Sequence, residues 1–210
     1  PLRHNCSGKH AGMLLLARAM GEPLESYIDP AHPVQRRIFE RFTEFVGSPF
    51  EDPVPAIDGC SAPTPRMPLS TLARAFALLA RGVDAAGKPL PALAEIRDAM
   101  AAHPENVAGE GRLDTMLMRS LKGAVVSKAG AEGMHATAHL ERGVGIAVKI
   151  ADGSRRALKP AILAVLEQLA LLSAEDRERI NPVEERLVRS YAGLLAGEIR
   201  PALELKRVGR

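Results

Sequence analysis

Apolar residues recur along the first half of the chain at the spacing of an α-helix. Within residues 33–46 they lie three or four positions apart, at Val34, Ile38, Phe42 and either Phe45 or Val46. Residues 11–20 are apolar on most sides, with a start near Ser7 and a stop at Gly21, so we expect a largely buried helix there. Two more segments show the helical pattern, 70–81 and 91–102.

The second half of the chain changes to short runs of β-prone residues separated by glycine-containing turns. These runs predict three strands of an antiparallel meander, 124–127, 134–140 and 144–150. A helix that begins at Arg156 or Lys159 and ends at Leu172 follows them. Between the helices, residues 48–68 are rich in proline and predict an ordered loop with a short strand at 54–57. Helices, then an antiparallel sheet, then a closing helix predict an α+β fold.

The pattern divides the chain into a body and a tail of one domain. Residues 1–172 carry the predicted helices and strands, whereas residues 173–210 form a charged tail. We expect this tail to be helical, with a helix over 183–195.

Composition and charge narrow the classes of function. The chain has 210 residues, of which 46% are hydrophobic and 25% charged, as in an ordinary soluble domain. It has no apolar run of membrane-spanning length and no signal-peptide pattern at its start, so we expect a cytoplasmic protein. A net charge of +3 with scattered basic residues and 3% aromatics argues against nucleic acid as a partner.

The two cysteines lie in short glycine-containing segments that resemble site-forming turns, 4–10 and 58–63. Nothing else suggests a secreted scaffold held by disulfides, so free thiols or metal ligands are favoured for Cys6 and Cys60. Thiolates suit zinc, but two of them leave the shell incomplete. The candidates to complete it are His4 or His10, Asp58, water and the neutral amine of Lys9.

A lysine at the end of a predicted strand is the second chemical feature. Lys128 is followed by Ala129 and Gly130, so the strand edge beside its ammonium is accessible and a substrate carboxylate could lie there. The tripeptide is similar to the Lys-Thr-Gly element of penicilloyl serine transferases. A lysine before a hairpin turn is also commonly just solvated.

Four segments taken together identify a family. They are His-Asn-Cys-Ser-Gly-Lys-His-Ala-Gly-Met at 4–13, Asp-Gly-Cys-Ser-Ala-Pro at 58–63, Ala-Gly-Glu-Gly-Arg-Leu-Asp-Thr at 108–115 and Val-Ser-Lys-Ala-Gly-Ala-Glu-Gly at 126–133. In this order they resemble the asparaginase II family, the rhizobial-type L-asparaginases. The resemblance covers most of the chain.

This resemblance implies a fold similar to serine β-lactamases and glutaminases, and an amidohydrolase that converts L-asparagine to L-aspartate and ammonia. The positions that match the family's zinc motif are Cys6, Lys9 and Cys60; Asp58 lies near the substrate, and Lys128 matches a catalytic lysine. The zinc is expected to be structural or modulatory. Lysine ligates only as the neutral amine, so a bound cation would have to lower the pKa of Lys9. A homodimer is also implied.

The family's nucleophilic serine belongs to a Ser-x-x-Lys element upstream of the matched segments. This sequence begins at Pro1, after that element, so we expect the 210 residues alone to be inactive. Ser7 and Ser61 are expected to orient their turns rather than to attack substrate. The alternatives are a catalytically inactive zinc-binding fragment and a related acyl hydrolase, either a glutaminase or a β-lactamase-like enzyme.

Other polar residues invite less specific interpretations. Three histidines outside the cysteine segments lack the spacing of a metal motif and are expected at the surface or in packing: His103, His135 and His139. Arg112 and Asp114 lie in a family-matching segment, where a structural salt link and a substrate contact are both open interpretations.

Overall fold

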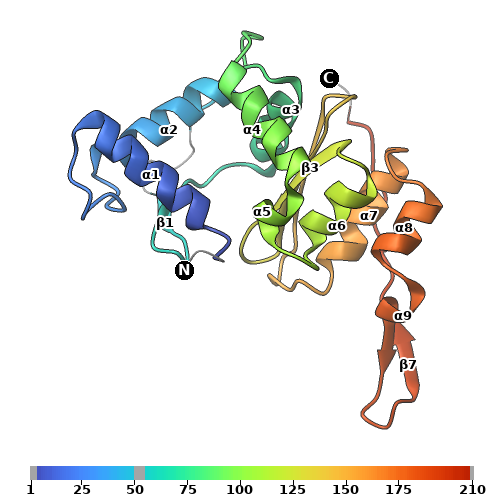
Figure 1. Ribbon diagram of the computed structural model, residues 1–210. Coiled ribbons are helices and arrows are strands. Elements are labelled where there is room, and N and C mark those ends of the chain that lie inside the picture. The colour runs from blue at the N-terminus through green and yellow to red at the C-terminus, as the bar shows by residue number, and fades with distance from the viewer. Residues whose placement is uncertain (1–3, 50–54, 209–210) are drawn as a thin grey trace.

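The computed structural model describes residues 4–49 and 55–208 and has the predicted α+β fold (Figure 1). The helices are α1 (Ser7–Met20), α2 (Pro33–Val46), α3 (Leu69–Arg81), α4 (Pro91–Ala102), α5 (Pro104–Ala108), α6 (Leu113–Ser120), α7 (Leu158–Gln168), α8 (Ala174–Ile180) and α9 (Val183–Arg186). The strands are β1 (Ala56–Ile57), β2 (Pro63–Thr64), β3 (Val125–Ala129), β4 (Met134–His139), β5 (Val144–Lys149), β6 (Leu187–Arg189) and β7 (Leu195–Glu198).

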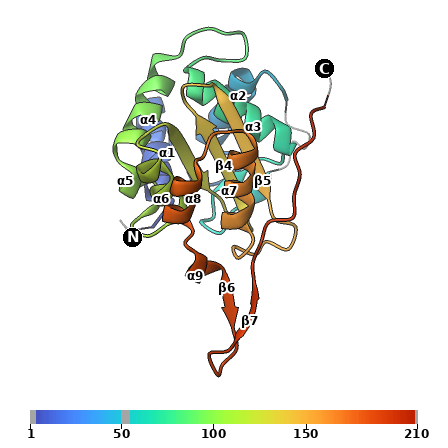
Figure 2. The ribbon, with the colours of Figure 1, turned by 90° about the vertical axis from the view of Figure 1, so that its right-hand side faces the viewer.

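The antiparallel sheet β3-β4-β5 lies at the centre of the main hydrophobic core. Helix α3 packs on β4 and β5, and α7 lies on the other side of the sheet (Figure 2). Lys128 pairs with Ala136, and Ala136 with Ala147. Because paired residues share a face and neighbours in a strand alternate, Lys128 lies on the α3 face and Ser127 on the opposite face.

Small side chains let α3 approach the sheet closely. Ala136, Ala138, Gly145 and Ala147 lie on the face that α3 covers. At Gly145 the main chain of α3 comes so near that a Cβ atom would overlap the oxygen of Ala73. Alanine and glycine at these positions therefore fix the distance between α3 and the strand layer.

Replacing Gly145 with alanine is expected to lower the free energy of unfolding by about 3 kcal/mol, since overpacking against main-chain atoms cannot be relieved by a rotamer change. Urea denaturation measures the effect. Gly12→Ala is the matched control, because no atom lies within 4 Å of the added Cβ atom in α1. It should stabilise by about 0.5–1 kcal/mol through helix propensity. Equal stabilities of the two variants would contradict the close packing of α3.

Helices α1 and α2 form a smaller layer beside the central sheet, with their own apolar cluster. Met13 and Ala17 of α1 are buried there, but Leu15 is 67% exposed. The expectation of a largely buried α1 is therefore wrong, because only one side of this helix meets a neighbour. Gly21 ends the helix as predicted, in a left-handed conformation with φ 71°.

The tail differs from its prediction. Helices α8 and α9 are followed by the hairpin β6-β7, which projects from the body (Figure 2). The predicted helix over 183–195 is therefore present only at Val183–Arg186. The turn between the strands uses Gly193 at φ 80°, a conformation that ends a helix and suits a hairpin.

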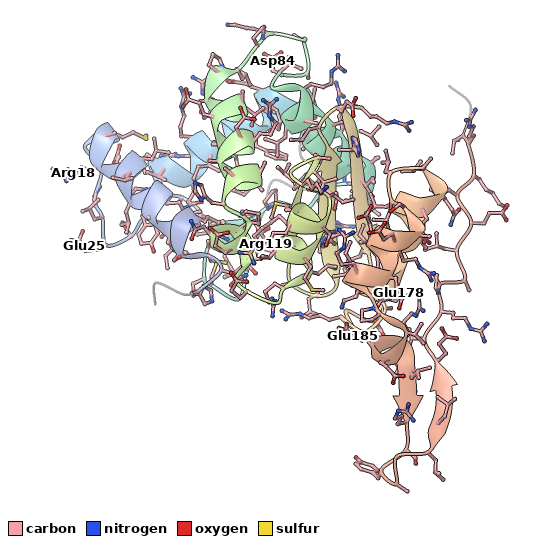
Figure 3. The ribbon with its side chains drawn as sticks, turned by 45° about the vertical axis from the view of Figure 1, so that its right-hand side comes forward. Arg18, Glu25, Asp84, Arg119, Glu178 and Glu185 are labelled. Atoms are coloured by element: carbon pink, nitrogen blue, oxygen red, sulfur yellow. The ribbon has the colours of Figure 1, made fainter. Side chains whose placement is uncertain are left out.

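Charged side chains join the tail to the body. Lys159 of α7 lies 2.6 Å from Glu185 of α9, which is labelled in Figure 3, and Arg177 of α8 lies 3.1 Å from Glu167 of α7. Elsewhere, Arg119 holds Glu110 in an ion pair of 2.7 Å. Such exposed pairs contribute little to stability individually.

Most predicted elements are present. The helices over 33–46 and 91–102 have the predicted bounds, and the final helix of the body is shorter, Leu158–Gln168. The strand predicted at 54–57 is found at Ala56–Ile57, while residue 54 is outside the described residues. Helices α5 and α6 were not predicted. Among the helices described, none has both the length and the apolar character needed to cross a membrane.

Candidate functional site

One cavity of about 460 Å³ brings the predicted site residues together. It lies between the turn before α1, the β1–β2 turn, and the end of β3 with the turn that follows it. Its lining includes Cys6, Lys9, Asp58, Cys60 and Lys128. All five residues singled out from the sequence therefore face the same space, although they are up to 122 positions apart, from 6 to 128.

The β1–β2 turn is held by its own hydrogen bonds. The Asp58 N–H donates to the carbonyl of Ala62 (2.9 Å), and the Ser61 N–H donates to the carbonyl of Asp58 (2.8 Å). Asp58 Oδ1 also accepts from the Gly59 N–H at 2.8 Å. Ser61 has φ 69°, so it shapes the turn. These bonds leave Asp58 Oδ2 and the Cys60 thiol directed toward the cavity.

Cys6 is held at the start of α1, where it occupies the N-cap position. Its carbonyl accepts from the His10 N–H at 3.1 Å, as the first bond of the helix. Its own N–H donates to His4 Nδ1 at 3.2 Å, and His4 lines the cavity. His10 does not line it and bonds the Tyr27 hydroxyl at 2.7 Å instead. Of the two histidines considered as ligands, only His4 therefore lines the cavity, and neither belongs to the group of converging ligand atoms.

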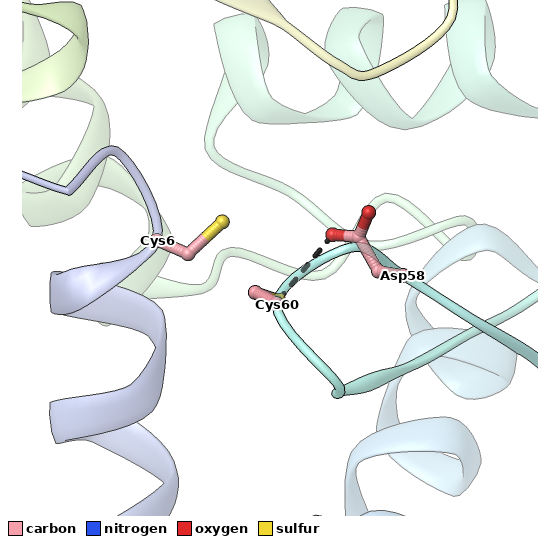
Figure 4. Close-up of side chains that lie close together, drawn as sticks. All are labelled: Cys6, Asp58 and Cys60. Carbon is pink, nitrogen blue, oxygen red and sulfur yellow. Dashed lines mark hydrogen bonds between the residues drawn. The ribbon is translucent and has the colours of Figure 1, made fainter.

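The thiol groups and one carboxylate converge (Figure 4). The ligand atoms of Cys6, Asp58 and Cys60 all lie within 4.8 Å of one another, and both cysteines are free. The Cys60 thiol donates to Asp58 Oδ2 at 3.4 Å. Lys9 Nζ lies 3.4 Å from the same oxygen. Two sulfurs and one carboxylate oxygen from two separate turns thus converge, and the amine of Lys9, from the start of α1, lies beside the carboxylate.

The charges of this cluster are coupled. Burial raises the pKa of the Cys6 thiol; Lys9 opposes the increase, and a hydrogen bond with Cys60 adds to it. Burial alone would lower the pKa of Lys9, but the bond with Cys60 and the negative partners around it raise that pKa overall. Burial would likewise raise the pKa of Asp58, yet hydrogen bonds from Gly59, Cys60 and Lys9 hold it below its usual value. Without metal, these shifts favour a carboxylate on Asp58, an ammonium on Lys9 and a protonated thiol on Cys6.

This donor set fits a zinc ion. Sulfur, nitrogen and carboxylate oxygen are the three atom types that bind zinc in proteins, and four ligands complete a structural site. The thiols and the lysine must lose protons to bind, because metal ligands are used in their deprotonated forms. The structure adds Asp58 to the set implied by the family resemblance, as a candidate ligand beside Lys9.

Lys128 reaches the cavity from the sheet. It is half-buried near the end of β3, and its Nζ donates to the carbonyl of Ala129 at 2.6 Å. Gly130 follows and also lines the cavity. The strand edge beside the ammonium is accessible, as expected from the Lys-Ala-Gly sequence.

A buried polar network lies on the opposite face of the same strand. The Ser127 hydroxyl donates to Asp114 Oδ1 at 2.8 Å, and His135 Nε2 lies 3.0 Å from that oxygen. Thr137 Oγ1 lies 3.3 Å from His135 Nδ1. All four residues are buried. Although burial alone would raise the pKa of Asp114, bonds from His135, Ser127 and the Ala129 N–H hold it below the usual value.

This network favours a structural role for Asp114, one of the two interpretations left open by the sequence. Asp114 does not line the main cavity; with the exposed Arg112 it lines a neighbouring one. His135 and His139 are buried in packing, and His103 is exposed, as expected. The sequence did not predict this hydrogen-bond network. The only feature of the sequence that pointed to it was the position of Asp114 in a family-matching segment.

Arg155 is a further cavity residue that sequence reasoning missed. It lies in the turn before α7, where no motif marks it. Only the folded chain brings it into the lining of the cavity that Lys128 also lines.

Comparison with protein families gives one match. A family model described as L-asparaginase II matches residues 1–201 of the chain. A search of curated proteins finds no match. The matched range includes both cysteine turns, the end of β3 and the residues around the cavity.

Proposed function

The chain belongs to the L-asparaginase II family, and from this premise we propose that the protein hydrolyses the side-chain amide of L-asparagine to L-aspartate and ammonia. The observation that carries the proposal is the shared cavity of Lys128, Asp58 and the two cysteine turns. A cavity with convergent polar groups is the usual setting for small-molecule chemistry.

The nucleophile in this proposal is a serine activated by lysine, located upstream of Pro1 in the gene product. Such a serine attacks the amide carbon, backbone N–H groups stabilise the oxyanion, ammonia leaves, and water hydrolyses the acyl-enzyme. Ser127 does not suit this role, because it is buried and bonded to Asp114. Lys128 would serve as base, proton relay or electrostatic partner at Nζ.

Asp58 is proposed to contact the substrate. Its lowered pKa keeps it a carboxylate, and Oδ2 faces the cavity beside Lys9. A carboxylate is a strong acceptor for the α-ammonium group of asparagine. Asp58 would therefore hold the α-carbon end of the substrate, the end opposite to the reacting side-chain amide.

We propose that Cys6, Lys9 and Cys60 hold a structural or modulatory zinc ion, with Asp58 as the neighbouring acceptor. Bound zinc would tie the turn before α1 to the β1–β2 turn and so fix one wall of the cavity. Cys6, Lys9 and Cys60 would then hold this wall in place while the substrate binds at the opposite wall of the cavity.

Cys60→Ser is expected to weaken zinc binding by at least about 100-fold, since even partners that only orient a ligand contribute 10–100-fold. Competition with a chromophoric chelator measures the affinity in the full gene product. Ser61→Ala, a change in the same turn that removes no thiol, is the control. Lys9→Ala should cost more affinity than Asp58→Asn; the reverse order would replace lysine by aspartate in the proposed shell.

The experiment for the proposed function is ammonia release by the full gene product. Faster release from L-asparagine than from L-glutamine supports the proposal, whereas the opposite preference indicates a glutaminase. Hydrolysis of a chromogenic β-lactam would indicate a β-lactamase-like enzyme. Zinc binding without any hydrolysis would identify a metal-binding module.

Three further expectations stay predictions. They are a β-lactamase-like arrangement in which residues 1–172 and 173–210 belong to one domain, a cytoplasmic location and a homodimer. Analytical ultracentrifugation of the full gene product tests the homodimer.

A further inference from the structure

We propose that Arg155 binds the α-carboxylate of the substrate; this rests on the function proposed above. Arg155 lies in the turn that leads from β5 into α7. Its side chain lines the main cavity with Lys128 and Asp58. It also lines a neighbouring cavity of about 180 Å³, which shares Ala129 and Gly130 with the first. Arg155 therefore stands beside the accessible strand edge.

The cavity carries more positive than negative charge, and Arg155 is the cation that can bind an anion. Without metal, Lys9 and Asp58 face each other at 3.4 Å and their charges largely offset each other. With zinc bound by two thiolates and the neutral amine of Lys9, the ion and its ligands would carry no net charge, and Asp58 would be the one negative charge beside them. Lys128 and Arg155 remain as cations, and the Lys128 ammonium already bonds the carbonyl of Ala129. The α-carboxylate is the negatively charged group of asparagine. A cavity with excess positive charge favours that end of the substrate.

No acid of the described residues pairs with the guanidinium of Arg155; Glu185, which lines a third cavity with it, is paired with Lys159 at 2.6 Å. Across residues 4–49 and 55–208, no hydrogen bond and no ion pair within 4.0 Å joins its side chain to another residue. The acid of the neighbouring cavity, Asp114, is buried and bonded to Ser127 and His135. Arginine can form two parallel hydrogen bonds with a carboxylate, which fixes its orientation as well as its position.

The adjacent Arg156 supplies a matched control. Both arginines are exposed and are neighbours in sequence, and both line a third cavity toward Lys159 and Glu185. Arg156 does not line either of the two cavities beside the strand edge. A change at Arg156 removes the same charge from the same turn without touching the proposed substrate site.

The test measures steady-state kinetics of ammonia release by the full gene product and its Arg155→Ala, Arg155→Lys and Arg156→Ala variants. Arg155→Ala is expected to raise KM for L-asparagine about 10- to 100-fold, the effect of losing hydrogen bonds to a charged group. kcat should change less, because the α-carboxylate is bound in ground and transition states alike. Arg155→Lys should restore part of the loss, and Arg156→Ala should behave as wild type.

A probe without the α-carboxylate separates binding from structural damage. β-Alaninamide is asparagine lacking that group, and its inhibition constant against asparagine hydrolysis can be measured whether or not it is itself hydrolysed. Arg155→Ala should leave this constant unchanged. The proposal is overturned if KM for asparagine does not rise, or if the inhibition constant of β-alaninamide rises equally. Absence of ammonia release by the wild type would instead overturn the proposed function.

Discussion

Lys128→Ala in the full gene product is expected to lower kcat for L-asparagine hydrolysis about 10²- to 10⁴-fold, the contribution of a side chain that transfers a proton in the transition state. Lys128 suits this role by its position: it ends a strand on the α3 face and lines the cavity that holds Asp58. The substitution removes the positive charge of Lys128 but leaves strand β3 in place. Ammonia release under saturating asparagine measures the effect.

Lys149→Ala is the matched control for this prediction. Lys149 is also a strand lysine of the same sheet, and its ammonium also bonds main-chain oxygens, those of Glu132 and Ile150. It does not line the cavity. Its replacement should leave kcat near the wild-type value. A Lys128→Ala enzyme as active as the Lys149→Ala enzyme would remove Lys128 from the proposed mechanism.

Asp114→Ala is expected to lower the free energy of unfolding by about 2–4 kcal/mol, since each buried polar group left without its hydrogen-bond partner costs about 1–3 kcal/mol. Asp114 is 2% exposed and is the common acceptor for Ser127 and His135. Its removal leaves a buried hydroxyl and a buried imidazole without that acceptor. Because this network joins α6 to β3 and β4, the loss should affect the whole sheet. Urea denaturation near neutral pH measures it.

The destabilisation by Asp114→Ala is expected to depend on pH. The pKa of Asp114 in the folded protein is below its ordinary value of 3.8. A carboxyl group of this kind contributes its full stability above pH 3.8, and the contribution is lost as pH falls through the lower folded pKa. The stability difference between wild type and Asp114→Ala should therefore be constant near neutral pH and decrease below pH 3.8.

Glu95→Ala is the control, because Glu95 is an exposed carboxylate on α4. It should leave the free energy of unfolding nearly unchanged at every pH. A wild-type stability for Asp114→Ala, or a difference that persists unchanged in acid, would mean that the Asp114 network does not hold the sheet.

The fold could be predicted where local sequence pattern decides the structure. The apolar spacing of 33–46 and the glycine-separated β-prone runs lead to α2 and to the meander β3-β4-β5. The tail could not be predicted in the same way. Its apolar residues fit a helix, but Gly193 takes a positive φ and makes a hairpin turn instead.

The site could be predicted as a set of residue types but not as an arrangement. The cysteine turns and Lys128 are marked by glycine and by the family resemblance. Arg155 is marked by neither, because its importance depends on where the turn before α7 lies. The Asp114 network depends on the packing of α6 against two strands, which no local pattern specifies.

We propose that the cavity between the cysteine turns and the end of β3 binds the substrate for amide hydrolysis. A crystal structure of the full gene product with L-aspartate, the proposed product, is the decisive experiment. Aspartate is expected in this cavity, between Asp58 and Lys128 with its α-carboxylate on Arg155. Aspartate bound elsewhere, with the cavity filled by another part of the protein, would contradict it.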